Sequence, residues 1–187
     1  MKKISYLLLL AGLTVSVRTA QATTVIPPTF DELVAQAEVI FQGDVTDVKS
    51  QWVGEGAQRH IVSYVTFKVE DALKGTPGQS YTIRMLGGTV DGETMGVSDA
   101  PKFKVGDKDI LFVQNNGSQF VPLVGIMHGR FHVKRDQAGQ EVVSNNEDEP
   151  VKNVARLGRA EGVDGPEANL TAADFKAAVK SKLQAPK

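Results

Sequence analysis

The side chains best suited to catalysis or metal binding are few, and they form no recognisable motif. The three histidines are His60, His128 and His132, and the last two stand four residues apart. On a helix this spacing would place two zinc ligands on one face. Here the segment includes Gly129 and reads as a strand, along which four residues span about 13 Å. We therefore expect no metal site and no cofactor.

Carboxylates and hydroxyls give equally weak indications of catalysis. Asp91, Glu93 and Asp99 lie in one polar segment and, with His128, are the residues that a hydrolase or a carbohydrate-active enzyme would use. No serine lies in a G-x-S-x-G turn, and the acidic run at 147–149 lacks the alternating ligands and central glycine of a calcium loop. Cysteine is absent. We expect a protein that is not an enzyme, with a hydrolase as the alternative.

Binding residues are easier to nominate. Trp52 is the single tryptophan and lies beside an expected hairpin turn, Tyr64 lies on a central strand, and Met95 lies in a polar loop. Aromatic side chains commonly anchor protein interfaces, although Trp52 could equally close one end of a β core. Together with Thr23 and Thr24, which would begin the mature chain, these residues are the candidate binding site for a protein partner.

The N-terminal residues are typical of a secretory signal peptide. Lys2 and Lys3 precede an apolar run that is too short to span a bilayer comfortably, and Ala20 and Ala22 supply the small residues of a cleavage site. The alternative, a membrane anchor, is disfavoured by Arg18, which closely follows the run. We expect residues 1–22 to be removed on export, which leaves a periplasmic or secreted protein with no membrane contact.

The charge balance argues against nucleic acid as a partner. The whole chain has a formal net charge of −1 at pH 7, and loss of Lys2, Lys3 and Arg18 with the signal peptide would make it −4. No basic block of the kind that binds a phosphate backbone is present. An exported protein without cysteine must also rely on core packing rather than on disulfides for its stability.

Alternating apolar residues predict a mainly β domain over residues 23–143. The capping-box pattern of Thr29 and Glu32 begins a short helix, and period-two alternation at 38–52 and 59–71 predicts a long hairpin. Further strands are expected near residues 81–85, 109–114, 119–124, 129–133 and 140–143. Strands joined in this way favour a closed or partly open OB-like antiparallel barrel, because closure removes unpaired edges.

Residues 144–187 are expected to form a polar linker and a peripheral, amphipathic C-terminal helix. Thr171 is a helix cap, and Phe175, Val179 and Leu183 recur at helical spacing. Three large apolar residues anchor a short helix weakly, and isolated helices of this length are marginal in water. We therefore expect the β domain to fold without this segment.

Three short motifs occur in a characteristic order along the chain. They are an A-x-x-I-x-x-G-x-V strand at 37–45, a return strand that closes on L-K-G at 73–75, and a V-G-D turn at 105–107 before a buried strand. In this layout the chain resembles uncharacterised exported bacterial proteins and, more distantly, the netrin-like domain of tissue inhibitors of metalloproteinases. The resemblance covers about residues 29–133.

What the resemblance implies is an OB-like five-stranded barrel with helices at its ends. Inhibitors of that class place a cysteine at the mature N-terminus, where it chelates the zinc of the protease. This chain has Thr23 and Thr24 there, so no inhibitory residue is carried over. Three functions follow for testing: a non-catalytic module that binds an envelope or secreted protein, a hydrolase, and a peptidase inhibitor.

Overall fold

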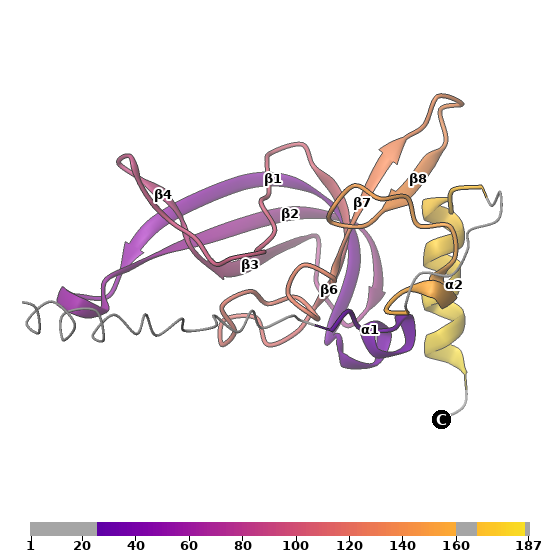
Figure 1. The fold of residues 1–187 in the computed structure, drawn as a ribbon, viewed down its shortest axis with the longest axis horizontal. Coiled ribbons are helices and arrows are strands. Elements are labelled where there is room, and N and C mark those ends of the chain that lie inside the picture. The colour runs from indigo at the N-terminus through magenta and orange to yellow at the C-terminus, as the bar shows by residue number, and fades with distance from the viewer. Residues whose placement is uncertain (1–25, 160–167, 186–187) are drawn as a thin grey trace, which may run out of the picture.

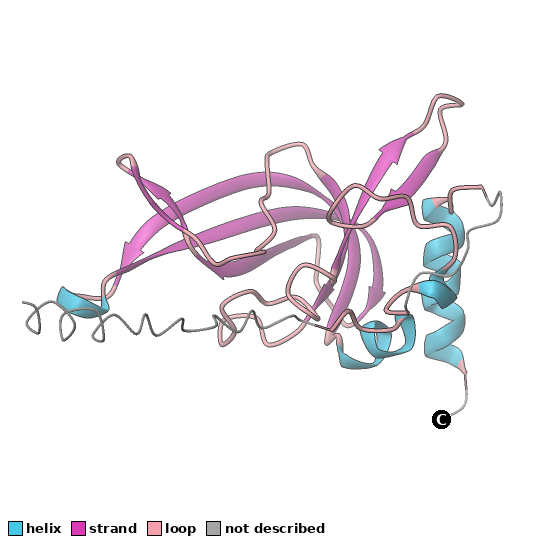
Figure 2. Ribbon diagram, viewed as in Figure 1, coloured by secondary structure: helices cyan, strands magenta, loops and turns pink. Residues whose placement is uncertain are grey.

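The computed structural model describes residues 26–159 and 168–185, and the expected signal peptide with Thr23 and Thr24 lies outside these ranges. The described chain is mainly β, with two α-helices, a six-stranded antiparallel sheet and a separate two-stranded sheet (Figure 1; Figure 2). The helices are α1 (Phe30–Gln36) and α2 (Ala172–Gln184), with short 3₁₀ turns η1 (Gly56–Gln58) and η2 (Val154–Arg156). The strands are β1 (Val39–Val53), β2 (His60–Lys74), β3 (Ser80–Leu86), β4 (Gly88–Val90), β5 (Glu93–Met95), β6 (Lys108–Val113), β7 (Arg130–Arg135) and β8 (Glu141–Ser144).

Helix α1 begins at the capping box that the sequence predicts. The backbone N–H of Glu32 donates to Thr29 Oγ1 at 3.3 Å, and the N–H of Thr29 donates to Glu32 Oε2 at 2.8 Å. These two bonds satisfy donors that a helix N-terminus otherwise leaves unpaired. The helix then buries Phe30, Leu33 and Val34 against the sheet.

The predicted hairpin is confirmed and forms the longest part of the sheet. β1 pairs with β2 from Ile40 opposite Lys74 to Val53 opposite His60, with irregularities that include one between Val45 and Asp47. Such bulges add bend and twist to a strand pair, and both strands curve strongly in Figure 1. The face of these strands that carries Val48 and Val65 lies toward β4, β5 and the chain that follows them.

Two core clusters lie on opposite faces of the sheet, because neighbouring residues of a strand point to opposite sides. On one face Ile40, Ile110 and Phe112 pack against both helices. On the other face Phe41 and Leu111, with the further residues Val45, Val65, Phe67, Ile83, Met85, Val113, Val121 and Leu123, form the second cluster. β6 is therefore buried on both faces, as its continuous apolar run predicts.

The order of the sheet is β3-β2-β1-β6-β7-β8, so the described strands do not close into a barrel. The prediction of a strand at 119–124 is wrong. This segment forms turns, with a single bridge between Val113 and Leu123. Pro122 explains the difference, since it has no N–H to donate to a strand ladder. The polar stretch that follows Gly87 instead contains the short pair β4 and β5.

The C-terminal helix is part of the core, and the expectation that it is peripheral and weakly anchored is wrong. Phe175 and Val179 are fully buried, whereas Leu183 is 37 % exposed. The ring of Phe175 contacts Phe131, with 4.8 Å between ring centroids, and also contacts Phe30 and Phe112. The described part of the expected linker is likewise tied to the sheet through bridges from Ser144 to Pro150 and from Val142 to Thr171.

Candidate functional site

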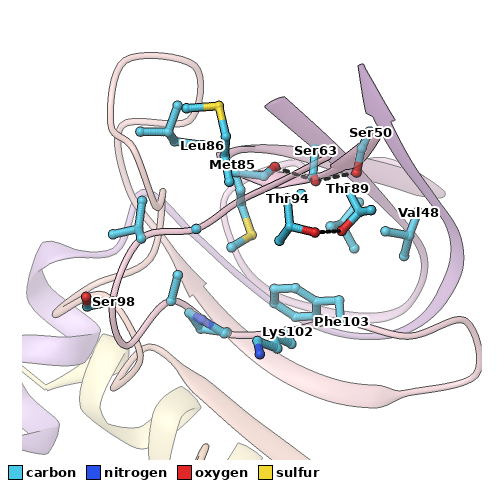
Figure 3. Close-up of a pocket in the computed structure, with 18 of the residues that line it drawn as sticks. Val48, Ser50, Ser63, Met85, Leu86, Thr89, Thr94, Ser98, Lys102 and Phe103 are labelled. Carbon is cyan, nitrogen blue, oxygen red and sulfur yellow. Dashed lines mark hydrogen bonds between the residues drawn. The ribbon is translucent and has the colours of Figure 1, made fainter. Parts of the chain in front are cut away.

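A pocket of about 870 Å³ lies between the face of the sheet that carries Val48 and Val65 and the chain that follows β5 (Figure 3). Its lining comes from β1, β2 and β3, from the β4–β5 pair, and from residues 96–103, which we call the covering segment. The apolar part of the lining includes Val48, Val65, Met85, Leu86, Val97 and Phe103. Asp99 and Lys102 are its two ionisable residues. The pocket is open to solvent, because Thr94 and Met95 in its lining are exposed.

Four of the five side-chain hydroxyl groups in the pocket lining are hydrogen-bonded within the protein, and the fifth belongs to the exposed Ser98. The hydroxyls of Ser50 and Ser63 lie 2.8 Å apart, and Ser63 donates to the carbonyl of Gly87 at 2.7 Å. Thr89 and Thr94 form a second pair, with 2.9 Å between their hydroxyl oxygens. Figure 3 shows both pairs on the same wall of the pocket.

Gly88 brings β4 close to the first hydroxyl pair. Its φ is +137°, and a Cβ at this position would collide with the hydroxyl oxygens of both Ser50 and Ser63. A side chain here would push β4 away from the two serines. The glycine thus permits the close approach of backbone and hydroxyls that forms this wall.

The structure separates the candidate binding residues. Met95 lines the pocket, and its Sδ accepts a hydrogen bond from the N–H of Ile61 at 3.2 Å. Trp52 pairs with Ile61 near the far end of the hairpin and stacks under the guanidinium of Arg59, 4.0 Å from the ring centroid. Tyr64 lies on β2, half-buried, and does not line the pocket.

A buried arginine anchors the covering segment. Arg130 of β7 is 3 % exposed, and its Nη1 donates to the carbonyl of Lys102 at 2.8 Å. Its guanidinium carbon also lies 4.0 Å from the ring centroid of Phe103. One side chain therefore fixes both the backbone and an aromatic ring at the C-terminal end of the segment.

The same arginine belongs to an ion-pair network at the sheet centre. Arg130 donates through Nε and Nη2 to Asp109 Oδ2 and through Nη2 to Asp107. Asp109 is fully buried, and its other oxygen lies 2.8 Å from Nδ1 of His132. Nε2 of His132 lies 3.7 Å from Asp148, so both ring nitrogens face carboxylates. This pattern of mutual pairing fits a structural network, because an unpaired charge at this depth would be costly.

A second charged cluster joins four strands outside the pocket. Lys108 Nζ lies 3.0 Å from Glu70, 3.3 Å from Glu141 and 3.9 Å from Asp44. Burial and the charge of Glu70 raise the pKa of Asp44. Burial alone would raise the pKa of Glu70 as well, but hydrogen bonds from Lys108 and Gln42 outweigh it and hold this pKa below its usual value.

The residues nominated for a hydrolase are not gathered into one site. Asp91, Glu93 and Asp99 are exposed, and Asp99 is the member of the set that lines the pocket. His128 is half-buried outside the pocket lining, and burial lowers its pKa against the opposing charge of Glu147. The arrangement gives no acid and base aimed at a common point, which general acid–base catalysis requires.

The pocket itself is the feature that sequence patterns miss. Ser50 and Ser63 occupy ordinary alternating positions of two strands, and the covering segment is irregular chain.

Within residues 26–159 and 168–185, no group of three histidine, aspartate or glutamate side chains is arranged to hold a metal ion. None of the described helices is long and apolar enough to cross a membrane. Neither models of known protein families nor curated protein sequences match this chain.

Proposed function

We propose that this protein is an exported, non-catalytic binding module that contacts another envelope or secreted protein through the rim of the pocket. The observation that carries the proposal is exposed apolar surface at this rim. Met95 is 37 % exposed, and Phe120 is 70 % exposed. The carbonyl of Phe120 accepts a hydrogen bond from Leu86, which lines the pocket. Aromatic and methionine side chains in such positions are frequent anchors of interfaces.

The distribution of charge supports binding rather than catalysis. The buried ionisable groups, centred on Arg130 and Asp109, pair with one another below the covering segment. The pocket lining holds one aspartate and one lysine among apolar and hydroxyl side chains. A surface of this kind recognises the shape and the apolar groups of a ligand. It holds few charges that could polarise a bond of a substrate.

Site-specific photo-crosslinking tests the proposal. Replacing Phe120 with p-benzoylphenylalanine in the mature chain should yield a discrete crosslinked protein from envelope extracts or culture medium. Ala138 is the matched control, because it is also exposed but lies in the turn between β7 and β8, which projects away from β3 and β4 (Figure 1). Equal labelling from both positions, or turnover by the purified protein in a hydrolase screen, would count against the proposal.

We propose, too, that the sheet is a partly open form of an OB-like barrel. The support is the segment at 115–124, which joins β6 at Leu123 and lies along β3 at its other end. There the carbonyl of Phe120 accepts from Leu86, and the side chain of Asn116 bonds to the backbone of Arg84 and Thr82. We also propose that the fold is related to netrin-like domains and that residues 1–22 are removed on export.

A further inference from the structure

The interior of the pocket has the size and surface of a small-molecule site. Its volume of about 870 Å³ falls inside the range of about 300–1,000 Å³ that is usual for such sites. Apolar side chains approach from both walls, with Val48, Val65 and Met85 on the sheet and Val97 and Phe103 on the covering segment. A ligand that fills this space must bring a mainly apolar surface with it.

The hydroxyl groups of the pocket set a second condition. Ser63 already donates to the Gly87 carbonyl and is paired with Ser50, and Thr89 is paired with Thr94. These bonds use the hydroxyl hydrogens of Ser50 and Ser63 and one of the two threonine hydrogens, so few donors of these pairs face a ligand. A polar ligand or the backbone of an inserted peptide would leave many of its own groups unpaired here, which costs free energy. A hydrocarbon chain makes no such demand, so the lining favours it over a peptide or a sugar.

Charge at the mouth of the pocket sets a third condition. Lys102 is the one cation among the residues that line the pocket, and Asp99, three residues before it, is the one anion. Arg130 holds the backbone of Lys102 in place, which fixes the origin of its side chain beside Phe103 (Figure 3). An anionic group at one end of a hydrocarbon chain would pair with Lys102.

We propose that the pocket binds a single hydrocarbon chain joined to an anionic group, as found in a long-chain fatty acid or in an acidic phospholipid. The chain lies between the sheet and the covering segment, and the anionic group lies at Lys102. This inference goes beyond the proposed protein contact, which uses the rim rather than the interior. It also gives the serine and threonine pairs a role, since their mutual hydrogen bonds leave few donors facing an apolar ligand.

Binding of a fluorescent polyene fatty acid, cis-parinaric acid, to the full mature chain is the direct test. Its emission should rise and saturate at one molecule per protein, and saturated fatty acids should displace it. Affinity in a series of increasing chain length should grow about two- to fourfold per added methylene until the pocket is full. The absence of saturable binding to protein that circular dichroism shows to be folded would overturn the proposal.

A matched pair of valine substitutions locates the site. Val97→Trp places an indole in the pocket, while the Val97 carbonyl keeps its bond to the N–H of Ala100. It should weaken binding by about tenfold or more, which corresponds to lost room for about two methylenes. Val105→Trp makes the same change eight positions along, at a residue that is 66 % exposed and outside the lining, and should leave affinity unchanged. Equal effects of the two would place the bound probe elsewhere.

A matched pair of lysine substitutions tests the anionic group. Lys102→Glu keeps the backbone carbonyl that Arg130 requires, and it should weaken fatty-acid binding about three- to tenfold at low salt. The fatty alcohol of equal chain length should bind the variant and the parent protein alike. Lys104→Glu, which is exposed and outside the lining, is the control. An equal loss for acid and alcohol would refute the role of Lys102.

Two further experiments identify the source of the hydrocarbon chain and test the two proposals separately. Incubation with phosphatidylglycerol vesicles, followed by gel filtration and mass spectrometry, shows whether the protein also takes up a phospholipid; the recovery of phospholipid identifies the membrane as source, and fatty-acid binding alone identifies the free acid. Crosslinking from position 120 in the Val97→Trp variant scores the protein contact separately. In the parent protein, fatty-acid binding without a crosslinked partner contradicts the proposed function, and a crosslinked partner without fatty-acid binding contradicts this inference. In the Val97→Trp variant the crosslink should persist while fatty-acid binding weakens, and loss of both would contradict the separation of rim and interior.

Discussion

In the core cluster on the pocket side, Phe67 lies between Phe41 of the sheet and Phe103 of the covering segment. Its ring contacts those of Phe41 and Phe103, each with 5.5 Å between centroids, and its side chain is fully buried. Phe67→Ala should lower the free energy of unfolding by about 3–5 kcal/mol, because it removes these contacts and leaves a cavity. Lys68→Ala, on the neighbouring exposed position, should change it by less than about 0.5 kcal/mol. Urea denaturation compares the two, and equal losses would mean that the faces of β2 are reversed.

Asp44 gives a pH-dependent test at the charged cluster. Burial and the charge of Glu70 raise its pKa above the ordinary value of 3.8. The neutral carboxyl therefore contributes stability below about pH 3.8, and this contribution is lost as the pH rises through the folded-state pKa. Asp44→Asn stays neutral throughout, so it should match the parent protein in acid and exceed it at pH 7. The gain should stay below about 1 kcal/mol because solvent screens the partly exposed charge.

Urea denaturation at pH 3.5 and at pH 7 measures this difference. Asp47→Asn is the control, because Asp47 lies on the same strand and forms an exposed ion pair with Lys49 at 2.9 Å. The control should show no gain at pH 7. A stabilisation by Asp44→Asn that is larger in acid than at neutral pH would have the wrong sign for a raised folded-state pKa.

At the scale of elements, sequence patterns succeed where one local rule decides the structure. Alternation predicts the β1–β2 hairpin, and the continuous apolar run predicts that β6 is buried on both faces. They fail where a distant contact decides. Phe175 is buried by Phe30, Phe112 and Phe131, residues far from it in the chain, and most helical stability in proteins comes from such packing.

The candidate site is less predictable than the fold, for the same reason. Met95 is nominated from the sequence and lies in the pocket lining, while its role in binding stays a prediction. The pocket exists because the covering segment folds back over one face of the sheet, and this depends on Arg130, which lies 28 residues after Lys102. No local pattern connects an arginine on one strand with the carbonyl of an earlier loop.

Helix α2 supplies the prediction that belongs to this scale. Phe175→Ala should lower the free energy of unfolding by about 3–5 kcal/mol, since it empties the centre of a cluster of aromatic rings. Leu183→Ala, on the same helix but 37 % exposed, should cost about 1 kcal/mol or less. Thermal and urea denaturation distinguish the two. A small loss for Phe175→Ala would restore the view that the helix is peripheral.

At the scale of the whole molecule, irregular chain covers both outer strands of the open sheet. β8 is bridged by Pro150 and Thr171. β3 is bridged by an amide side chain, since Asn116 Oδ1 accepts from the N–H of Arg84 at 3.0 Å and Asn116 Nδ2 donates to the carbonyl of Thr82 at 2.9 Å. An uncovered edge strand is a template for pairing with another chain, so these contacts help to keep the molecule from associating through its edges.

Asn116→Ala should therefore uncover the edge of β3. The N–H of Arg84 would lose its acceptor and exchange faster with deuterated solvent, and concentrated protein should show more self-association by sedimentation velocity. Ser118→Ala is the matched control, because the Ser118 hydroxyl bonds within its own loop, to the carbonyl of Asn115. It should alter neither the exchange at Arg84 nor the association state. If Asn116→Ala leaves the exchange at Arg84 unchanged, the amide is not what protects this edge, and the Phe120–Leu86 backbone bond must hold the segment in place by itself.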